Sequence, residues 1–116
     1  MLITRLYSGS DGESHFEDIE IPLKMIGLND SRSDSIPATG IFIRATQGEF
    51  ELDWHNAPRR QLLIMLKGQS EVIVGDGTRR QLNPGDIMLA EDISGRGHIT
   101  RAVNQQPRMS VFVTLD

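Results

Sequence analysis

The chain has 116 residues, enough for one domain that buries about two thirds of the surface its unfolded form exposes. The absence of cysteine excludes disulfides, thiolate metal ligands and cysteine nucleophiles. Sixteen acidic against twelve basic residues give a net charge of −4, so neither nucleic acid nor an anionic membrane is an expected partner. The longest apolar run, residues 62–66, cannot span a bilayer, and the N-terminus lacks a signal-peptide pattern, so we expect a cytoplasmic protein.

The first third of the chain predicts two strands and a loop. Residues 2–7 and 15–23 have strand patterns and flank a Ser/Gly/Asp turn at 8–12. Residues 23–28 form one helical turn at most. The polar segment 29–37 is expected to be a solvated surface loop, with a lid over a barrel mouth as the alternative.

The rest of the chain predicts strands alone. In residues 39–47 a period of two places Ile41 and Ile43 on one face, with Phe42 and Arg44 on the other. Turn residues separate nearly all of the further expected strands, which are residues 50–55, 61–67, 71–74, 79–82, 87–90, 99–103 and 109–115. Around ten short strands predict an all-β sandwich or barrel formed by one domain, residues 1–116. The expected core is Ile41, Ile43, Leu62, Ile64, Leu66, Val72, Val74, Ile87, Leu89, Val111 and Val113.

Two histidine-containing motifs mark the middle of the chain. The first, DWHNAPRRQLLIMLKG at 53–68, has His55 followed by Gln61 and then by Gly68. The second, LNPGD at 82–86, is followed by His98. Between residues 48 and 104 these motifs resemble those of the cupin superfamily, the RmlC-like jelly-roll barrels. The chain departs from the family pattern at Ala57, where the second histidine would stand, at Gln61 in place of glutamate, and at His98, two residues late.

The resemblance implies a cupin-type double-stranded β-helix that brings His55 and His98 into one pocket, and in many members a divalent metal. Iron, manganese, nickel or zinc are the candidate metals, and a site without metal is equally plausible. In an extended strand Asp53 would share a face with His55. Asp53, His55 and His98 then make a two-histidine, one-carboxylate set of the kind that holds non-heme iron, with Gln61 as an additional weak ligand.

A metal-free use of the same residues is also open. Some cupins that lack the full ligand set are isomerases or epimerases, in which a histidine abstracts a proton. A dyad of Asp53 and His55 could serve as such a base, because a carboxylate fixes the histidine tautomer. The plainer interpretation makes His55 and His98 barrel-lining residues that bond to backbone and water.

Residues outside the histidine pair give further expectations. Four arginines lie near the motifs: Arg59, Arg60, Arg96 and Arg101. They would suit a ligand carboxylate or phosphate if some of them faced the barrel mouth, the alternative being a solvated rim. His15 is expected on the surface, and Trp54 on the opposite side of its strand from His55.

The resemblance also implies a homodimer, since small cupins commonly pair through an N-terminal strand or a sheet face. We favour a small-molecule-binding cupin of undetermined activity, with a pocket around His55, Gln61 and His98. An oxygenase-like or isomerase enzyme and a non-catalytic structural or regulatory module are the alternatives.

Overall fold

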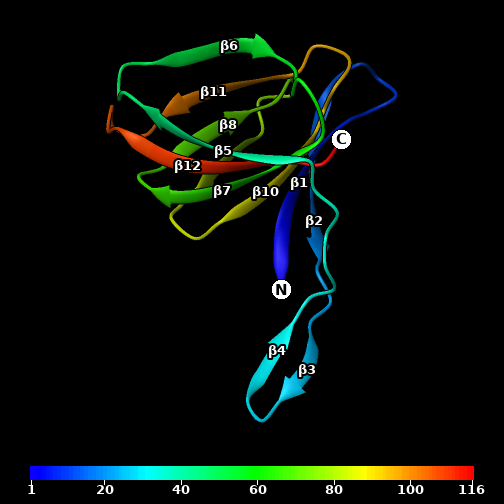
Figure 1. The fold of residues 1–116 in the computed structure, drawn as a ribbon. Helices are drawn as coiled ribbons and strands as arrows, with labels where there is room; N and C mark the ends of the chain where they lie inside the picture. Colours follow the sequence, from blue (N-terminus) through cyan, green and yellow to red (C-terminus); the bar gives the residue numbers. More distant parts are fainter.

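Twelve β-strands and no helix make up the regular structure of the computed structural model, which covers residues 1–116. Figure 1 shows a barrel from which one hairpin extends. The strands are β1 (Leu2–Ser8), β2 (Ser14–Glu20), β3 (Lys24–Gly27), β4 (Asp30–Arg32), β5 (Gly40–Thr46), β6 (Glu51–His55), β7 (Gln61–Lys67), β8 (Ser70–Ile73), β9 (Arg79–Leu82), β10 (Ile87–Glu91), β11 (His98–Ala102) and β12 (Arg108–Thr114). The all-β prediction is confirmed, and no helix is long and apolar enough to cross a membrane.

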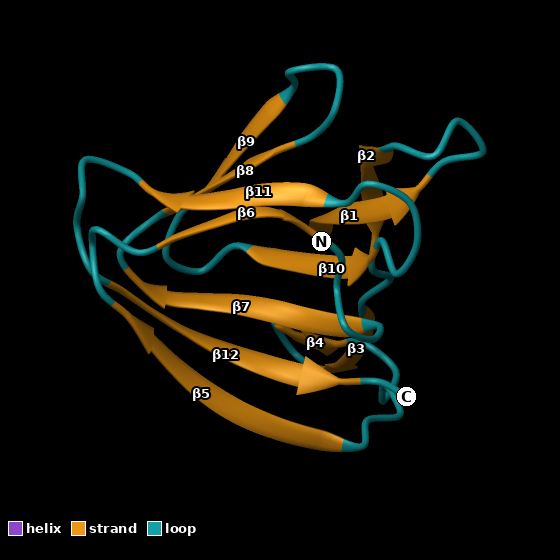
Figure 2. Ribbon diagram, turned by 90° about the horizontal axis from the view of Figure 1, so that it is seen from above, coloured by secondary structure: helices purple, strands orange, loops and turns teal.

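Two sheets face each other to form the barrel (Figure 2). The larger has the order β2-β1-β10-β7-β12-β5 and the smaller the order β6-β11-β8-β9. All neighbours are antiparallel except β1 and β10, which are parallel. The strands β3 and β4 pair only with each other. The interleaving of early and late strands means that chain segments far apart in sequence build each wall.

The turn between β9 and β10 shows how the sequence fixes strand direction. Asn83, Pro84, Gly85 and Asp86 form a four-residue turn, in which the Asp86 amide donates to the Asn83 carbonyl oxygen at 2.9 Å. Proline pre-sets its own φ, and Gly85 has a φ of 91°, a conformation that costs other residues energy. The Asp86 side chain accepts a bond from the Asn83 amide at 2.8 Å, which closes the turn from the other side.

The core forms on the sheet face opposite to the one predicted. Leu63, Met65, Met88 and Ala90 are buried between the sheets, together with Val72, Val74, Leu6 and Leu82. Of the predicted core residues, only Val72 and Val74 are buried. The prediction was wrong for Ile41, Ile43 and Leu66, which are exposed, and for Leu62, Ile64, Ile87, Leu89, Val111 and Val113, which are half-buried. Both faces of the larger sheet are apolar, so alternation identified each face but not which one points inward.

The segment that follows β2 is the other difference. Residues 23–28 contain β3 rather than a helical turn, and β4 occupies part of the predicted loop at 29–37. No residue from 29 to 37 lines the barrel cavity, so this segment is no lid over the mouth within its own chain.

Adjacent residues of β7 test which face is the core. Met65→Ala is expected to cost about 2–5 kcal/mol of unfolding free energy, because Met65 is buried between the sheets. Leu66→Ala should cost under about 1 kcal/mol, because half of the Leu66 side chain is exposed. Urea unfolding of both variants at one protein concentration provides the comparison, and equal losses would contradict the assignment.

Candidate functional site

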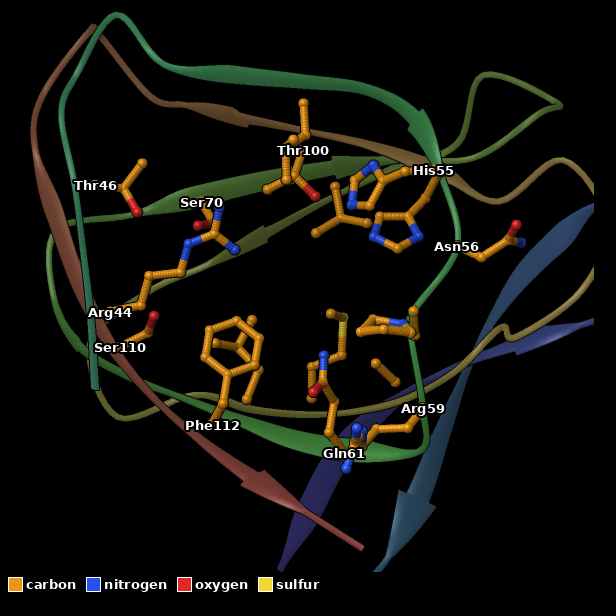
Figure 3. Close-up of a pocket in the computed structure, with 18 of the residues that line it drawn as sticks. Arg44, Thr46, His55, Asn56, Arg59, Gln61, Ser70, Thr100, Ser110 and Phe112 are labelled. Atoms are coloured by element: carbon orange, nitrogen blue, oxygen red, sulfur yellow. The ribbon is translucent and has the colours of Figure 1, made fainter. Parts of the chain in front are cut away.

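A cavity of about 510 Å³ lies between the two sheets. In Figure 3 Arg44, His55 and Gln61 point into it from three sides. Its lining residues are Phe42, Arg44, Thr46, Leu52, His55, Asn56, Ala57, Pro58, Arg59, Gln61, Leu63, Ser70, Val72, Met88, Ala90, His98, Thr100, Arg108, Ser110, Phe112 and Thr114. Arginine, histidine and small hydroxyl side chains therefore share the interior with apolar ones, whereas no aspartate or glutamate lines it.

His55 and His98 meet in this cavity, as the resemblance to cupins implied. They are register partners on the antiparallel strands β6 and β11, and their ring centroids are 4.3 Å apart. The loop before His98 passes close to His55. A Cβ on Gly97 would lie 2.0 Å from the His55 carbonyl oxygen, and the φ of Gly97 is +81°, so only glycine fits there.

A buried carboxylate orients His98. Oδ2 of Asp92, a residue with no exposed surface, lies 2.5 Å from Nδ1 of His98 and accepts a bond from the Ser14 hydroxyl at 2.8 Å. The Ala57 amide donates to the Asp92 carbonyl oxygen at 3.2 Å. A carboxylate at Nδ1 keeps the proton on that nitrogen, so Nε2 of a neutral His98 carries the free lone pair. His98 and Asp92 thus form a His–Asp dyad at the cavity wall.

His55 is held by the backbone instead. Its Nδ1 donates to the Asp53 carbonyl oxygen at 2.7 Å, which leaves Nε2 as the acceptor of the neutral ring. Burial lowers the pKa of His55, and the nearby His98 and Arg44 lower it further, outweighing the bond to the Asp53 carbonyl. Near neutral pH, His55 therefore offers an uncharged imidazole.

The Asp53 carboxylate does not reach the cavity, so the predicted Asp53–His55 dyad and the metal set containing Asp53 are not assembled. Between the pairs His98–His55 and Thr100–Leu52, β6 carries one residue more than β11. This bulge breaks the alternation, so Leu52 and His55 line the cavity while Asp53 and Trp54 are exposed. Trp54 lies away from His55, as predicted.

The donors present do not suit a catalytic divalent cation. No group of three histidine or acidic side chains converges anywhere in the chain. His55 and His98 have one unpartnered ring nitrogen each, and Gln61 adds only a neutral oxygen. Such a cation requires at least three converging donors and negative charge around it. Here the charged side chains that line the cavity are the cations Arg44, Arg59 and Arg108, and the Asp92 carboxylate is already bonded to His98.

Of the arginines predicted from the motifs, only Arg59 lines the cavity. Arg60 bonds Glu91 at 2.6 Å, and Arg101 bonds Glu71 at 2.9 Å. Arg96 pairs with Glu13 and lies over the Trp54 ring. All three lie outside the cavity lining, and this part of the prediction was wrong. His15 pairs with Asp11 on the edge strand β2, away from the cavity, as expected.

Arg44 and Arg108 contribute charge to the cavity without any ion-pair partner. Arg108 is only 6% exposed, and its Nη1 is buried with no hydrogen-bond acceptor. Burial lowers the pKa of Arg108, and the neighbouring Arg44 lowers it further. Arginine nevertheless stays protonated in proteins, so a fixed positive charge stands unpaired inside the barrel. The exposed Arg59 adds a third guanidinium to the lining.

Two of these features had a signal in the sequence. Arg44 occupies the Phe42 face of β5, so the alternation already placed it with the residues that turned out to face inward. Asp92 belongs to the long loop 91–97, which lies between the second motif and His98. Arg108 had no motif around it.

A proton NMR titration of the three histidines tests the environment of His55. The titration midpoint of His55 is expected below 6.5, the ordinary pKa of a histidine, because burial disfavours the charged ring. Since the unfolded chain binds this proton more readily, His55 should reduce the stability of the fold as the pH falls below about 6.5. Arg44→Gln should raise the midpoint, and Arg101→Gln, whose arginine pairs with Glu71, should not. A midpoint at or above 6.5 in the unmodified protein would contradict this environment.

Comparison with protein families and with curated proteins finds no match. Solved structures do match. A Cupin 2 conserved barrel domain protein from Salinispora arenicola is 18% identical with a TM-score of 0.53, over 66% of this chain and 61% of that one. A Streptococcus pyogenes protein of unknown function is 17% identical with a TM-score of 0.54, over 72% and 69% of the two chains. A Neisseria meningitidis protein is 17% identical with a TM-score of 0.53, over 66% and 72%.

The chain thus spans about three fifths of the length of the Salinispora protein. Identities this low carry information about the fold alone. The two facing sheets and these three likenesses agree on the fold: the chain forms a cupin-type jelly-roll barrel.

Proposed function

We propose that the barrel cavity binds a small organic anion that carries a carboxylate or phosphate group. The observation that supports this most directly is Arg108, a buried guanidinium with no acceptor for its Nη1. An unpaired buried charge costs several kcal/mol, and a bound anion would offset that cost. Guanidinium groups also match the geometry of carboxylate and phosphate oxygens.

The charge of the whole cavity supports the same ligand class. Arg44, Arg59 and Arg108 line it, and none of the 21 lining residues is acidic. This local positive charge stands inside a protein with a net charge of −4, so the overall composition does not account for it. The site would attract a small anion that enters the cavity, whereas the rest of the surface repels polyanions.

The apolar part of the cavity indicates that the anion is attached to a carbon skeleton. Phe42 and Phe112 stack with their ring centroids 4.9 Å apart, and Leu63, Val72 and Met88 complete the apolar lining. Pockets for organic ligands combine apolar walls with a few polar groups that fix orientation. His55, Gln61 and His98 supply such groups and would hold a hydroxyl or carbonyl of the ligand.

Arg108→Met tests the proposal by removing the buried charge and keeping the length of the side chain. Calorimetric titration with a panel of dicarboxylates, sugar phosphates and inorganic phosphate should detect binding to the unmodified protein. The variant should bind roughly ten- to a hundred-fold more weakly, since a hydrogen bond to a charged group contributes about 1.5–3 kcal/mol. Without ligand, the same variant should gain roughly 1 kcal/mol or more of unfolding free energy.

Arg101→Gln is the matched control, because Arg101 pairs with Glu71 outside the cavity. Its affinity should equal that of the unmodified protein. Equal binding by Arg108→Met and by the control would contradict the assignment of Arg108 to the anion. Failure of every carboxylate and phosphate to bind or to raise the melting temperature would contradict the proposed ligand class.

Proton abstraction from the bound anion is a second candidate function, which the His98–Asp92 dyad favours. The carboxylate keeps Nδ1 of His98 protonated, so Nε2 is free to accept a proton from a ligand carbon or hydroxyl. The His55 ring centroid lies 4.3 Å from that of His98, and Nε2 of the neutral His55 is free to accept a hydrogen bond from a ligand hydroxyl. This arrangement would serve an isomerase or epimerase without metal.

Ligands that bind in the titration should, under this second function, exchange a carbon-bound proton in D2O, which NMR follows directly. Asp92→Asn should slow the exchange at least tenfold by disturbing the His98 tautomer, whereas Asp53→Asn should have no effect because its carboxylate is exposed. Binding without exchange for every ligand would indicate a non-catalytic binding module.

A further inference from the structure

The unpaired positive charge of the cavity is divided between two places. Strand β5 holds Arg44 opposite Ser110 of β12. Strand β7 holds Gln61 opposite Thr114 of β12, and Arg59 lies just before β7 in the chain. The backbone positions of Ser110 and Thr114 are about 13 Å apart in an extended strand. Figure 3 shows Arg44 and Arg59 at opposite sides of the cavity.

The first place, which we call the Arg108 group, consists of Arg44, Arg108 and the hydroxyls of Thr46, Ser70 and Ser110. Arg108 is the register partner of Thr46, beside the pair of Arg44 and Ser110. Ser70 joins them from β8 in the smaller sheet (Figure 3). Apart from the half-buried Arg44, these residues are between 2% and 8% exposed.

The Arg108 group offers more donors than a carboxylate can accept. Two guanidinium groups and three hydroxyls can all donate to a bound anion. A carboxylate has two oxygens, whereas a phosphate ester presents three strong acceptor oxygens and a larger negative charge. A phosphate is therefore the anion that this group fits best.

The second place, which we call the Arg59 group, has Arg59 and Gln61 as its donors. Arg59 is exposed and has no ion-pair partner in the chain, whereas the next residue, Arg60, bonds Glu91 at 2.6 Å. The Gln61 side chain is buried and carries an amide donor. One guanidinium fork beside one amide matches the two oxygens of a carboxylate.

Apolar side chains separate the two groups. Phe112 lies between Ser110 and Thr114 on the cavity side of β12 and stacks on Phe42, with the ring centroids 4.9 Å apart. Its ring centroid is also 5.9 Å from the Arg44 guanidinium carbon. A ligand that reaches both groups would lay its carbon chain along these rings.

We propose that the ligand carries two anionic groups, a phosphate held by the Arg108 group and a carboxylate held by the Arg59 group, joined by a short carbon chain. This inference rests on the proposed function and adds which anions the ligand carries and where each one binds. A ligand with a single anion would leave one of the two groups without a counter-charge.

Matched ligands test the two anions separately. Calorimetric titration at neutral pH and constant ionic strength compares 3-phosphoglycerate with glycerol 3-phosphate and glycerate, which keep only the phosphate or only the carboxylate. A longer set consists of 6-phosphogluconate, glucose 6-phosphate and gluconate. In at least one set the ligand with both anions should bind at least tenfold more tightly than the phosphate-only ligand. The phosphate-only ligand should in turn bind more tightly than the carboxylate-only ligand.

Variants of the two groups assign each anion to its place. Arg59→Gln should weaken binding of the ligand with both anions about tenfold, so that its advantage over the phosphate-only ligand falls below about threefold. Arg44→Gln should weaken both ligands by similar factors, because both carry the phosphate. Arg79→Gln is the matched control, since Arg79 is exposed and pairs with Glu71 outside the cavity, and it should change neither affinity.

The outcomes separate this inference from the proposed function. Equal affinities for the phosphate-only ligand and the ligand with both anions, in both sets, would overturn the second anion and leave the single-anion function standing. Tighter binding of the carboxylate-only ligands would overturn the phosphate at the Arg108 group. Failure of all six ligands, while a dicarboxylate binds, would overturn this inference alone. Failure of every carboxylate and phosphate would overturn the proposed ligand class as well.

Discussion

The buried carboxylate of Asp92 is the group on which the site depends. Its bonds reach Ser14 of β2 in the larger sheet and His98 of β11 in the smaller one. The backbone of the same residue receives the amide of Ala57, in the segment that leads from β6 to β7. A charge at this depth is stable only when donors surround it, so the donors must arrive together as the two sheets close. The orientation of His98 is thus a consequence of barrel closure.

Another part of the cavity carries positive charge that has no ion-pair partner. Arg108 is also buried, yet its Nη1 has no acceptor, and the nearby Arg44 adds repulsion. A fold tolerates such a cost where function requires it, because structural charges are paired in nearly all proteins. One end of the cavity therefore holds a satisfied acid and base pair, and the other holds unpaired cations. A ligand with an anionic end and a polar group along its carbon skeleton would match both ends.

The two faces of the larger sheet differ in side-chain composition. The inner face mixes Arg44, Gln61 and Ser110 with Leu63 and aromatic rings, since it must hold a polar cavity and a core together. The opposite face, which points away from the cavity, carries mainly aliphatic side chains along β5, β12, β7 and β10, with Glu91 at the end of β10. Solvent-facing sides of antiparallel sheets are usually polar, so aliphatic rows there call for a covering layer.

The sequence by itself determined the all-β class and most strand positions, because alternation and turn residues are local properties. The resemblance of its motifs to those of cupins implied the meeting of His55 with His98. Only the tertiary structure decided that the Ile41 face points outward, since both faces are apolar and local pattern does not rank them. The bulge in β6 directs Asp53 away from the cavity, because one extra residue reverses the alternation on which the prediction rested. The carboxylate that contacts a histidine of the site is instead Asp92, which bonds His98. The structure also identified Arg108 as a cavity residue. No sequence pattern predicted it, because the side chains that converge on a cavity are set by contacts between strands far apart in the chain.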